Sequence, residues 1–184
     1  MEKTPDIQSS NRPKRIVITG PESTGKSTLA SQLAEHFGGY YIEEYARHYV
    51  ENLYRPYNYS DIEAIALMQI EQYKQYDKPD QILFFDTFLI VTKVWFLEVY
   101  GTEPEWLNTA LGSLHIDLYI LCRPDLPWVA DTVRENGHRR EYLFTKYQEL
   151  LETFNLNYRV LEGNGKKRLQ NAINLIEHQE NQLV

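Results

Sequence analysis

An eight-residue segment from Gly20 to Ser27, GPESTGKS, constrains this chain more than any other feature, because it fits the pattern G-x-x-x-x-G-K-[ST]. The β-branched run 15–19 precedes it, and residues 27–37 follow with apolar side chains at helical spacing. Glycines in such a loop let successive N–H groups turn toward phosphate oxygens, and the following helix directs the positive end of its dipole there. The sequence therefore predicts a P-loop that binds a nucleoside triphosphate; a glycine-containing turn without a ligand is the alternative.

The chemistry of a P-loop assigns roles to its polar residues. Lys26 is expected to bridge the β- and γ-phosphates of ATP, and the hydroxyl of Ser27 to bind Mg²⁺. One arginine from further along the chain is added to the loop as a nucleotide-binding residue. The full set expected to bind the nucleotide is Gly20, Glu22, Ser23, Thr24, Gly25, Lys26, Ser27, Thr28 and Arg139.

Strands and helices alternate along the chain. Strands are predicted at residues 15–19, 40–42, 81–85, 116–121 and 158–161. Helices are predicted at residues 27–37, 60–76, 89–100, 104–114, 142–154 and 167–177, with Ser60 as an N-cap and Glu63 completing a capping box. This alternation indicates an α/β fold: a three-layer α/β/α P-loop NTPase with a five-stranded parallel sheet, flanking helices and a lid after strand 4. We expect a flexible tail over residues 1–14 and one P-loop domain over 15–184.

Composition narrows the partners. The net charge of −7 argues against nucleic acid or an anionic membrane, whose phosphates would be repelled. Between residues 41 and 105, 12 acidic residues stand against 5 basic ones. A single cysteine, Cys122, excludes an intrachain disulfide and suits a reducing cytosol, and no apolar stretch reaches membrane length. We expect a cytoplasmic protein with a small-molecule substrate and no nucleic-acid or membrane partner; its oligomeric state stays open.

The third predicted strand ends in a carboxylate, Asp86, after a run of apolar residues. That position places Asp86 near Mg²⁺, although it could instead cap the following helix. An ATPase motor typically has a second acid next, where this chain has Thr87, and a GTPase would carry an Asn-Lys-x-Asp string, which does not occur. Both absences favour phosphoryl transfer to a bound small molecule over hydrolysis.

Basic residues gather after the fourth strand, where small-molecule kinases of this fold keep a lid. Within residues 123–146 lie Arg134, Arg139, Arg140 and Lys146. Phosphoryl transfer is catalysed mainly by positioning and charge neutralisation, so guanidinium groups delivered by a lid would stabilise the transferring phosphoryl group. Arg134 is the predicted catalytic arginine; a solvated basic helix face is the alternative for each.

Two acids and a ring follow the second strand at the edge where open α/β sheets bind ligands. Glu44 is expected to accept a proton from an acceptor hydroxyl, and Tyr45 to stack on a flat or cationic ring. Paired glutamates that open a helix are often only dipole partners, and this is the alternative for Glu43 and Glu44.

With these residues in view, the chain resembles the ribosylnicotinamide kinase domain of the bacterial NadR family. The resemblance runs in order through GPESTGKS at 20–27, EYAR at 44–47, FDT at 85–87, Thr92-Lys93, Tyr100-Gly101, DLY at 117–119 and WVAD at 128–131 with Arg134. It implies a P-loop kinase that uses ATP and Mg²⁺ to phosphorylate the 5′-hydroxyl of nicotinamide riboside, giving nicotinamide mononucleotide. The catalytic residues are then Lys26, Asp86, Glu44 and Arg134, and the acceptor is bound by Glu44, Tyr45, Arg47, Asp86, Trp128 and Asp131.

The chain departs from the family pattern at some of these places. Phe88 replaces an aspartate that the family often has after Asp86-Thr87, and Thr132 replaces a glycine after Asp131. The family can have an aromatic residue directly before the Glu-Tyr pair, where this chain has Glu43. Two rival functions therefore stay open: a kinase of another nucleoside or vitamin alcohol, and a regulatory nucleotide-binding module without turnover. The base preference of the nucleotide and the presence of a separate adenylyltransferase stay open as well.

Overall fold

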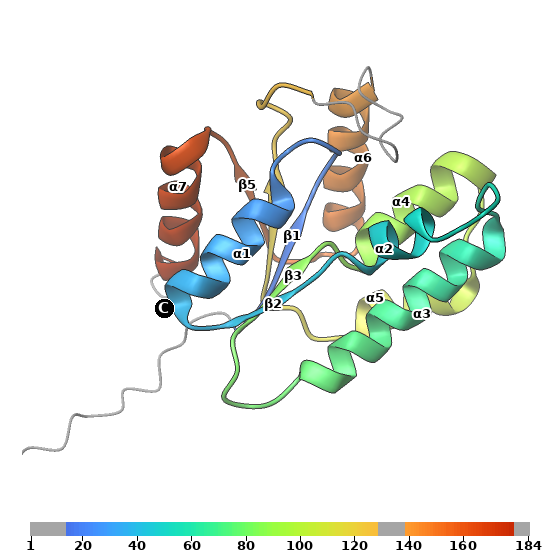
Figure 1. The fold of residues 1–184 in the computed structure, drawn as a ribbon, viewed down its shortest axis with the longest axis horizontal. Coiled ribbons are helices and arrows are strands. Elements are labelled where there is room, and N and C mark those ends of the chain that lie inside the picture. The colour runs from blue at the N-terminus through green and yellow to red at the C-terminus, as the bar shows by residue number, and fades with distance from the viewer. Residues whose placement is uncertain (1–13, 129–138, 179–184) are drawn as a thin grey trace, which may run out of the picture.

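The computed structural model describes residues 14–128 and 139–178. Five strands form one sheet (Figure 1): β1 (Arg15–Thr19), β2 (Tyr40–Ile42), β3 (Leu83–Asp86), β4 (Leu118–Cys122) and β5 (Tyr158–Leu161). The helices in this part of the chain are α1 (Lys26–Phe37), α2 (Tyr45–Glu51), α3 (Tyr59–Tyr76), α4 (Leu89–Tyr100), α5 (Glu105–Ser113), α6 (Arg140–Thr153) and α7 (Gly165–Glu177). The predicted α/β fold with a five-stranded parallel sheet is confirmed.

The strand order is β2-β3-β1-β4-β5, and every pairing is parallel. From β1 the chain crosses to β2 at one edge of the sheet, and from β3 it crosses over β1 to β4 and then β5 at the other edge. The order of the strands therefore reverses beside β1, which lies between β3 and β4. In open α/β sheets ligands bind at such a reversal, beyond the carboxyl ends of the strands. The loops after β1, β3 and β4 all leave the sheet at that edge.

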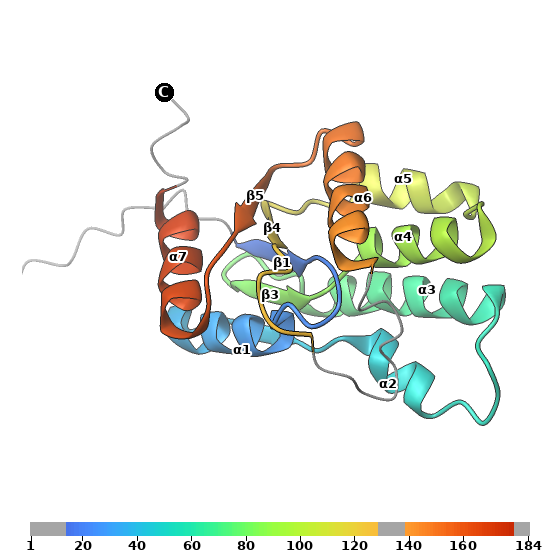
Figure 2. The same cartoon turned by 90° about the horizontal axis from the view of Figure 1, so that it is seen from above.

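Helices cover both faces of the sheet. Figure 2 shows α1 and α7 on one side, with α3, α4, α5 and α6 on the other. Each face buries its own apolar cluster: Leu29, Leu33 and Ile176 lie in one, while Phe85, Phe96 and Leu151 lie in the other. The central strands β1, β3 and β4 are buried on both faces, which explains their continuous apolar sequences.

The start of α3 differs from the prediction. Asn58 is the N-cap, and its side chain accepts a hydrogen bond from the N–H of Asp61, whose carboxylate accepts the N–H of Asn58 in return. The predicted box of Ser60 and Glu63 is wrong, because Asn58 and Asp61 form the same reciprocal pair of hydrogen bonds two residues earlier. Glu63 instead accepts a hydrogen bond from the indole N–H of Trp106 at 2.9 Å.

Other boundaries shift by a few residues. The helix α2 was not among those predicted, and α6 and α7 begin two residues earlier than expected. The tail predicted for residues 1–14 lies outside the described residues except for Lys14, whose N–H is bound by the Asp117 carboxylate at 2.8 Å. Among the helices that are described, none has the length and apolar character needed to cross a membrane.

Candidate active site

The loop between β1 and α1 is shaped by two glycines. Gly20 has φ 128° and lies so close to the backbone of Cys122 at the end of β4 that a Cβ would approach its carbonyl oxygen to 2.7 Å. Gly25 has φ 73° and is the N-cap of α1, with no side-chain cap on the first turn. Contact with Cys122 excludes a side chain at Gly20, and the backbone conformation at both positions favours glycine. The first-turn N–H groups of α1 therefore have no capping side chain.

Side chains within the loop hold its shape. The hydroxyl of Thr24, fully buried, donates to the carbonyl oxygen of Pro21 at 2.9 Å, and Lys26 Nζ donates to the same oxygen at 2.8 Å. Ser23 adopts φ 55°, which is uncommon outside glycine. The predicted nucleotide-binding residues 20–28 are thus gathered in one compact turn at the carboxyl edge of the sheet.

Asp86 ends β3 beside this loop and is 2% exposed. Its Oδ2 accepts a hydrogen bond from the Tyr41 hydroxyl at 3.3 Å, while Oδ1 has no hydrogen-bonding partner within the described residues. Burial raises the pKa of Asp86 above its ordinary value, and Ser27, Lys26 and Tyr41 act in the opposite direction. The helix-cap alternative for Asp86 is wrong, because Phe88 is the N-cap of α4.

A buried carboxylate oxygen without a partner fits a Mg²⁺ site. Ser27 is near enough to act on the pKa of Asp86, so the two predicted metal ligands lie together. Across residues 14–128 and 139–178, no group of three or more His, Cys, Asp or Glu side chains could hold a metal by itself. Mg²⁺ is commonly bound through one or two protein oxygens together with phosphates and water.

The residue after Asp86 is strained. Thr87 has φ 66°, a conformation that a β-branched residue rarely adopts, and its N–H donates to the carbonyl oxygen of Ile18 at 3.0 Å. The hydroxyls of Thr87 and Thr19 are both buried without a partner among the described side chains. Strained backbone and unpaired polar groups cluster at functional sites, and both occur here at the ends of β1 and β3.

The acceptor-side residues surround the same edge. Glu44 is the N-cap residue of α2, and its side chain makes no capping hydrogen bond. The alternative that it serves only as a partner of the helix dipole stays open, because the carboxylate stands at the N-terminus of this helix. Burial raises the pKa of Tyr41 and that of Tyr147 on α6, and the charge of Glu44 raises both further. Arg47 pairs with Glu51 at 3.9 Å, and its positive charge lowers the pKa of Asp86.

The segment after β4 reaches the P-loop at two points. Trp128 donates from its indole N–H to Glu22 at 3.2 Å, and Arg140 donates to the carbonyl oxygens of Leu126, at 2.8 Å, and Ser23, at 3.4 Å. Arg139 points elsewhere, because its guanidinium pairs with Glu98 on α4. Its predicted role at the nucleotide has no contact to support it. Asp131 and Arg134 lie outside the described residues, so their roles stay predictions.

Three residues at this edge were not singled out as site residues from the sequence. Tyr41 holds Asp86, Thr87 carries the strained turn, and Arg168 on α7 donates to the carbonyl oxygen of Thr24 at 3.0 Å. Only Thr87 had a local signal, its position directly after the predicted metal ligand. The contacts of Tyr41 and Arg168 join residues 45 and 144 positions apart.

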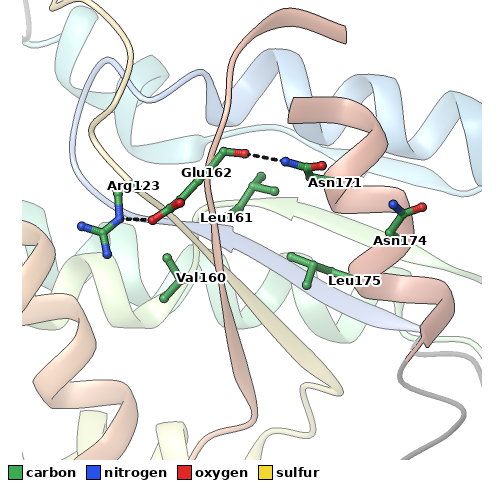
Figure 3. Close-up of a pocket in the computed structure, with 7 residues that line it drawn as sticks. All are labelled: Arg123, Val160, Leu161, Glu162, Asn171, Asn174 and Leu175. Atoms are coloured by element: carbon green, nitrogen blue, oxygen red, sulfur yellow. Dashed lines mark hydrogen bonds and ion pairs between the residues drawn. The ribbon is translucent and has the colours of Figure 1, made fainter. Parts of the chain in front are cut away.

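A separate cavity of about 470 Å³ lies along the outer edge of β5, against α7. Figure 3 shows Arg123 paired with Glu162 at its mouth and Asn171 donating to the Glu162 backbone. No residue of the P-loop lines it. The cavity therefore does not belong to the candidate active site.

Comparison with known proteins shows the family to which the chain belongs. A family model described as an AAA domain matches residues 15–168. The chain is homologous to the trifunctional NAD biosynthesis/regulator protein NadR of Escherichia coli, with 30% identity over 182 residues, and to that of Salmonella typhimurium, with 28% over 172 residues. These matches cover 89% of this chain but only 42% of each relative.

Solved structures share the fold. A NadR protein in complex with NAD and AMP-PNP superposes with a TM-score of 0.75 at 23% identity, covering 94% of this chain and 51% of that one. A NadR protein in complex with NR gives 0.73 at 21% identity, covering 94% and 52%. A deoxyadenosine kinase from M. mycoides gives 0.63 at 16% identity, covering 89% of this chain and 98% of the kinase.

Proposed function

Because the chain belongs to the AAA-domain family whose model spans residues 15–168, and is homologous to NadR, we propose that it is an ATP- and Mg²⁺-dependent kinase of nicotinamide riboside. The product would be nicotinamide mononucleotide, with the phosphoryl group on the 5′-oxygen. The chain shares P-loop nucleotide binding and a kinase fold with its relatives. The acceptor, the metal and the residue roles below are the proposal.

One observation carries it: the P-loop, the buried carboxylate of Asp86 and the Glu44-Tyr45 pair meet at one edge of the sheet. Asp86 and Ser27 lie together on the nucleotide side, while Glu44 approaches from β2 and α2. In-line phosphoryl transfer requires the phosphoryl donor and the hydroxyl acceptor to face each other, as residues on these two sides of the site would allow. The proposal is supported by two NadR structures of the same fold, one in complex with NR and the other in complex with NAD and AMP-PNP.

On the donor side, the loop N–H groups and Lys26 would bind the β- and γ-phosphates. Lys26 Nζ lies on the Pro21 carbonyl oxygen at 2.8 Å, so it would exchange this contact for phosphate oxygens when ATP binds. Ser27 Oγ and Asp86 Oδ1 would hold Mg²⁺, whose charge offsets the negative charge of the phosphates. Arg140, which already reaches Ser23 O, is placed to add positive charge at the same loop.

On the acceptor side, Glu44 would accept the proton of the 5′-hydroxyl as that oxygen attacks phosphorus. Tyr45 and Trp128 offer aromatic faces, and Trp128 is 41% exposed beside Glu22. Nicotinamide riboside carries a fixed positive charge on its pyridinium ring, unlike ordinary nucleosides. The excess acid between residues 41 and 105 and these rings suit such a cation.

An acceptor panel tests the proposal. Coupled ADP release is measured with nicotinamide riboside, deoxyadenosine, thymidine and vitamin alcohols, at fixed ATP and Mg²⁺. Deoxyadenosine belongs in the panel because the match with the M. mycoides kinase covers 98% of that chain. We expect stimulation by nicotinamide riboside at least tenfold above that by any other acceptor. Greater stimulation by another alcohol would show that this alcohol, and not nicotinamide riboside, is the acceptor. ATP binding without stimulation of ADP release by any acceptor would indicate a regulatory module.

A further inference from the structure

Arg168 is a buried arginine in a position that is costly for a cation. It is 4% exposed and lies in the first turn of α7, behind Lys166 and Lys167. A cation in the first turn of a helix opposes the helix dipole, and α7 has no acidic residue there to offset it. Burying a guanidinium also carries a large desolvation cost, which an apolar residue of similar size would avoid.

The contacts of Arg168 join three loops at the carboxyl edge of the sheet. Nη1 donates to Asp125 Oδ1 at 2.8 Å and to Gly163 O at 2.7 Å, while Nη2 donates to Thr24 O at 3.0 Å and to Arg123 O at 3.3 Å. Asp125 completes the arrangement by accepting the N–H of Gly163 at 2.6 Å. One side chain therefore ties the P-loop to the segment after β4 and to the loop before α7.

The contact with Thr24 has a consequence for phosphate binding. A peptide unit is planar and trans, so its C=O and N–H point in opposite directions. The Thr24 carbonyl shares its peptide with the N–H of Gly25, the N-cap of α1. When Arg168 holds that carbonyl behind the loop, the Gly25 N–H is turned toward the opposite side, where a phosphate oxygen would bind.

The neighbouring peptide is held in the same manner. Arg140 donates to Ser23 O, and this contact fixes the direction of the Thr24 N–H. Two arginines from separate elements thus orient two successive N–H groups, and both also bind the segment after β4, through Arg123 O and Leu126 O. Arg168 differs in that it lies wholly behind the loop and cannot itself be a ligand of the phosphates without leaving four acceptors.

We propose that Arg168 is a positioning residue of the nucleotide site, which presets the P-loop for phosphate by holding the Thr24–Gly25 peptide. A loop with this peptide free to rotate would have to order it on binding, which lowers affinity. Lysine keeps the charge but replaces a planar fork of donors by a single ammonium, so it cannot serve Asp125, Gly163 and Thr24 in the same geometry. The inference rests on the proposed nucleotide site but not on the identity of the acceptor.

The test is calorimetric titration of Arg168→Lys with AMP-PNP and Mg²⁺, in the full chain, together with thermal unfolding. The matched control is Arg15→Lys, because Arg15 also pairs with an aspartate, Asp77, and also donates to a backbone carbonyl, but at the opposite edge of the sheet. We expect nucleotide affinity to fall at least about tenfold in Arg168→Lys and less than twofold in Arg15→Lys. The KM for the acceptor should stay within about twofold of the wild-type value in both variants.

The outcomes separate this inference from the proposed function. If the wild type does not bind AMP-PNP, the nucleotide site itself is wrong. If it binds and Arg168→Lys binds equally well, or if the two variants lose affinity in proportion to their loss of melting temperature, Arg168 is only structural. Should Arg168→Lys fail to fold, Asp125→Asn serves instead, since Asp125 is more exposed and its loss loosens Arg168; unchanged affinity in that variant overturns the inference.

Discussion

The Tyr41 hydroxyl donates a hydrogen bond to Asp86 Oδ2 at 3.3 Å, from β2 to the neighbouring strand β3. Burial and the charge of Asp86 raise the pKa of Tyr41 far above its ordinary value, so the hydroxyl remains a donor at physiological pH. One carboxylate oxygen is thereby held and the other, Oδ1, is left without a partner in the described structure. The pair fixes which oxygen of Asp86 is available to a metal.

Tyr41→Phe should therefore weaken the use of Mg²⁺ without unfolding the protein. Loss of a partner that orients a metal ligand typically costs tenfold or more in metal affinity or activity. We expect the Mg²⁺ concentration at half-maximal rate to rise by about tenfold, measured at saturating ATP and acceptor. Tyr158→Phe is the control, because Tyr158 donates to Glu152 at the outer strand β5. Superimposable Mg²⁺ curves for Tyr41→Phe and the wild type would contradict this role.

Lys26→Ala should abolish turnover and leave the fold intact. Its amino group donates to the Pro21 carbonyl oxygen within the loop, and its side chain is only partly buried, so no core packing is lost. Removing a positive charge from the transferring phosphates should lower kcat by at least about 100-fold. Initial rates and thermal melting are measured together; near-wild-type turnover by a folded variant is incompatible with the kinase assignment.

Arg139 and Arg140 are adjacent in sequence, but the structure predicts different kinetic effects for them. Arg140 reaches the P-loop at Ser23, while Arg139 pairs with Glu98 and lies over the ring of Tyr142. We expect Arg140→Gln to lower kcat/KM for ATP by about tenfold and Arg139→Gln by less than threefold. Equal losses would mean that Arg139 leaves Glu98 for the nucleotide during turnover, as the sequence-based prediction had it.

Glu44→Gln should act on the acceptor. The substitution is nearly isosteric but removes the proposed proton acceptor, so kcat/KM for nicotinamide riboside should fall at least tenfold, or about 1.4 kcal/mol. AMP-PNP affinity should change little, because Glu44 belongs to β2 and α2 and not to the P-loop. Glu43→Gln is the matched control, since Glu43 is exposed. A loss of nucleotide affinity in Glu44→Gln, or no loss of rate, would move the catalytic carboxylate to Asp86.

Asp61 predicts a pH dependence of stability. Its carboxylate accepts two hydrogen bonds from Arg55 and one each from Tyr49 and the Asn58 N–H, and these hold its pKa well below the ordinary value of 3.8. A group with a depressed folded pKa contributes stability above its unfolded pKa and loses it as pH falls. Wild-type melting temperature should therefore drop faster than that of Asp61→Asn below about pH 4. Parallel curves would show that this cap carries no linked proton.

Much of the fold followed from local pattern. The strands β1, β2 and β5 begin and end where the apolar runs predicted, because sheet burial and sequence polarity change together there. The start of α3 was misplaced because Asn58 and Ser60 are both good caps, and only the contact of Asp61 with Arg55 and Asn58 selects between them. Arg55, Asn58 and Asp61 lie within six positions of one another, so this choice depends on which local side chains contact each other and not on residue type alone.

The site was predictable only in part, for the same reason. The P-loop, Asp86 and Glu44 follow directly from their positions after strands. The start and rotation of α6 decide that Arg140, and not Arg139, faces the P-loop. Trp128 contacts Glu22, which lies 106 positions away in the sequence. Arg168 was not among the predicted site residues, because its contacts with Gly163 and Thr24 depend on how the loop before α7 packs against the P-loop.

The most direct test of the account is transfer of label from [γ-³²P]ATP by the purified chain to nicotinamide riboside, with Mg²⁺ as the only added metal and the products separated chromatographically. We expect label in nicotinamide mononucleotide in equal amount to the ADP formed, and no label there for Lys26→Ala. ADP formation accompanied by labelled inorganic phosphate alone, or label on a different acceptor in preference to nicotinamide riboside, would contradict the proposed function.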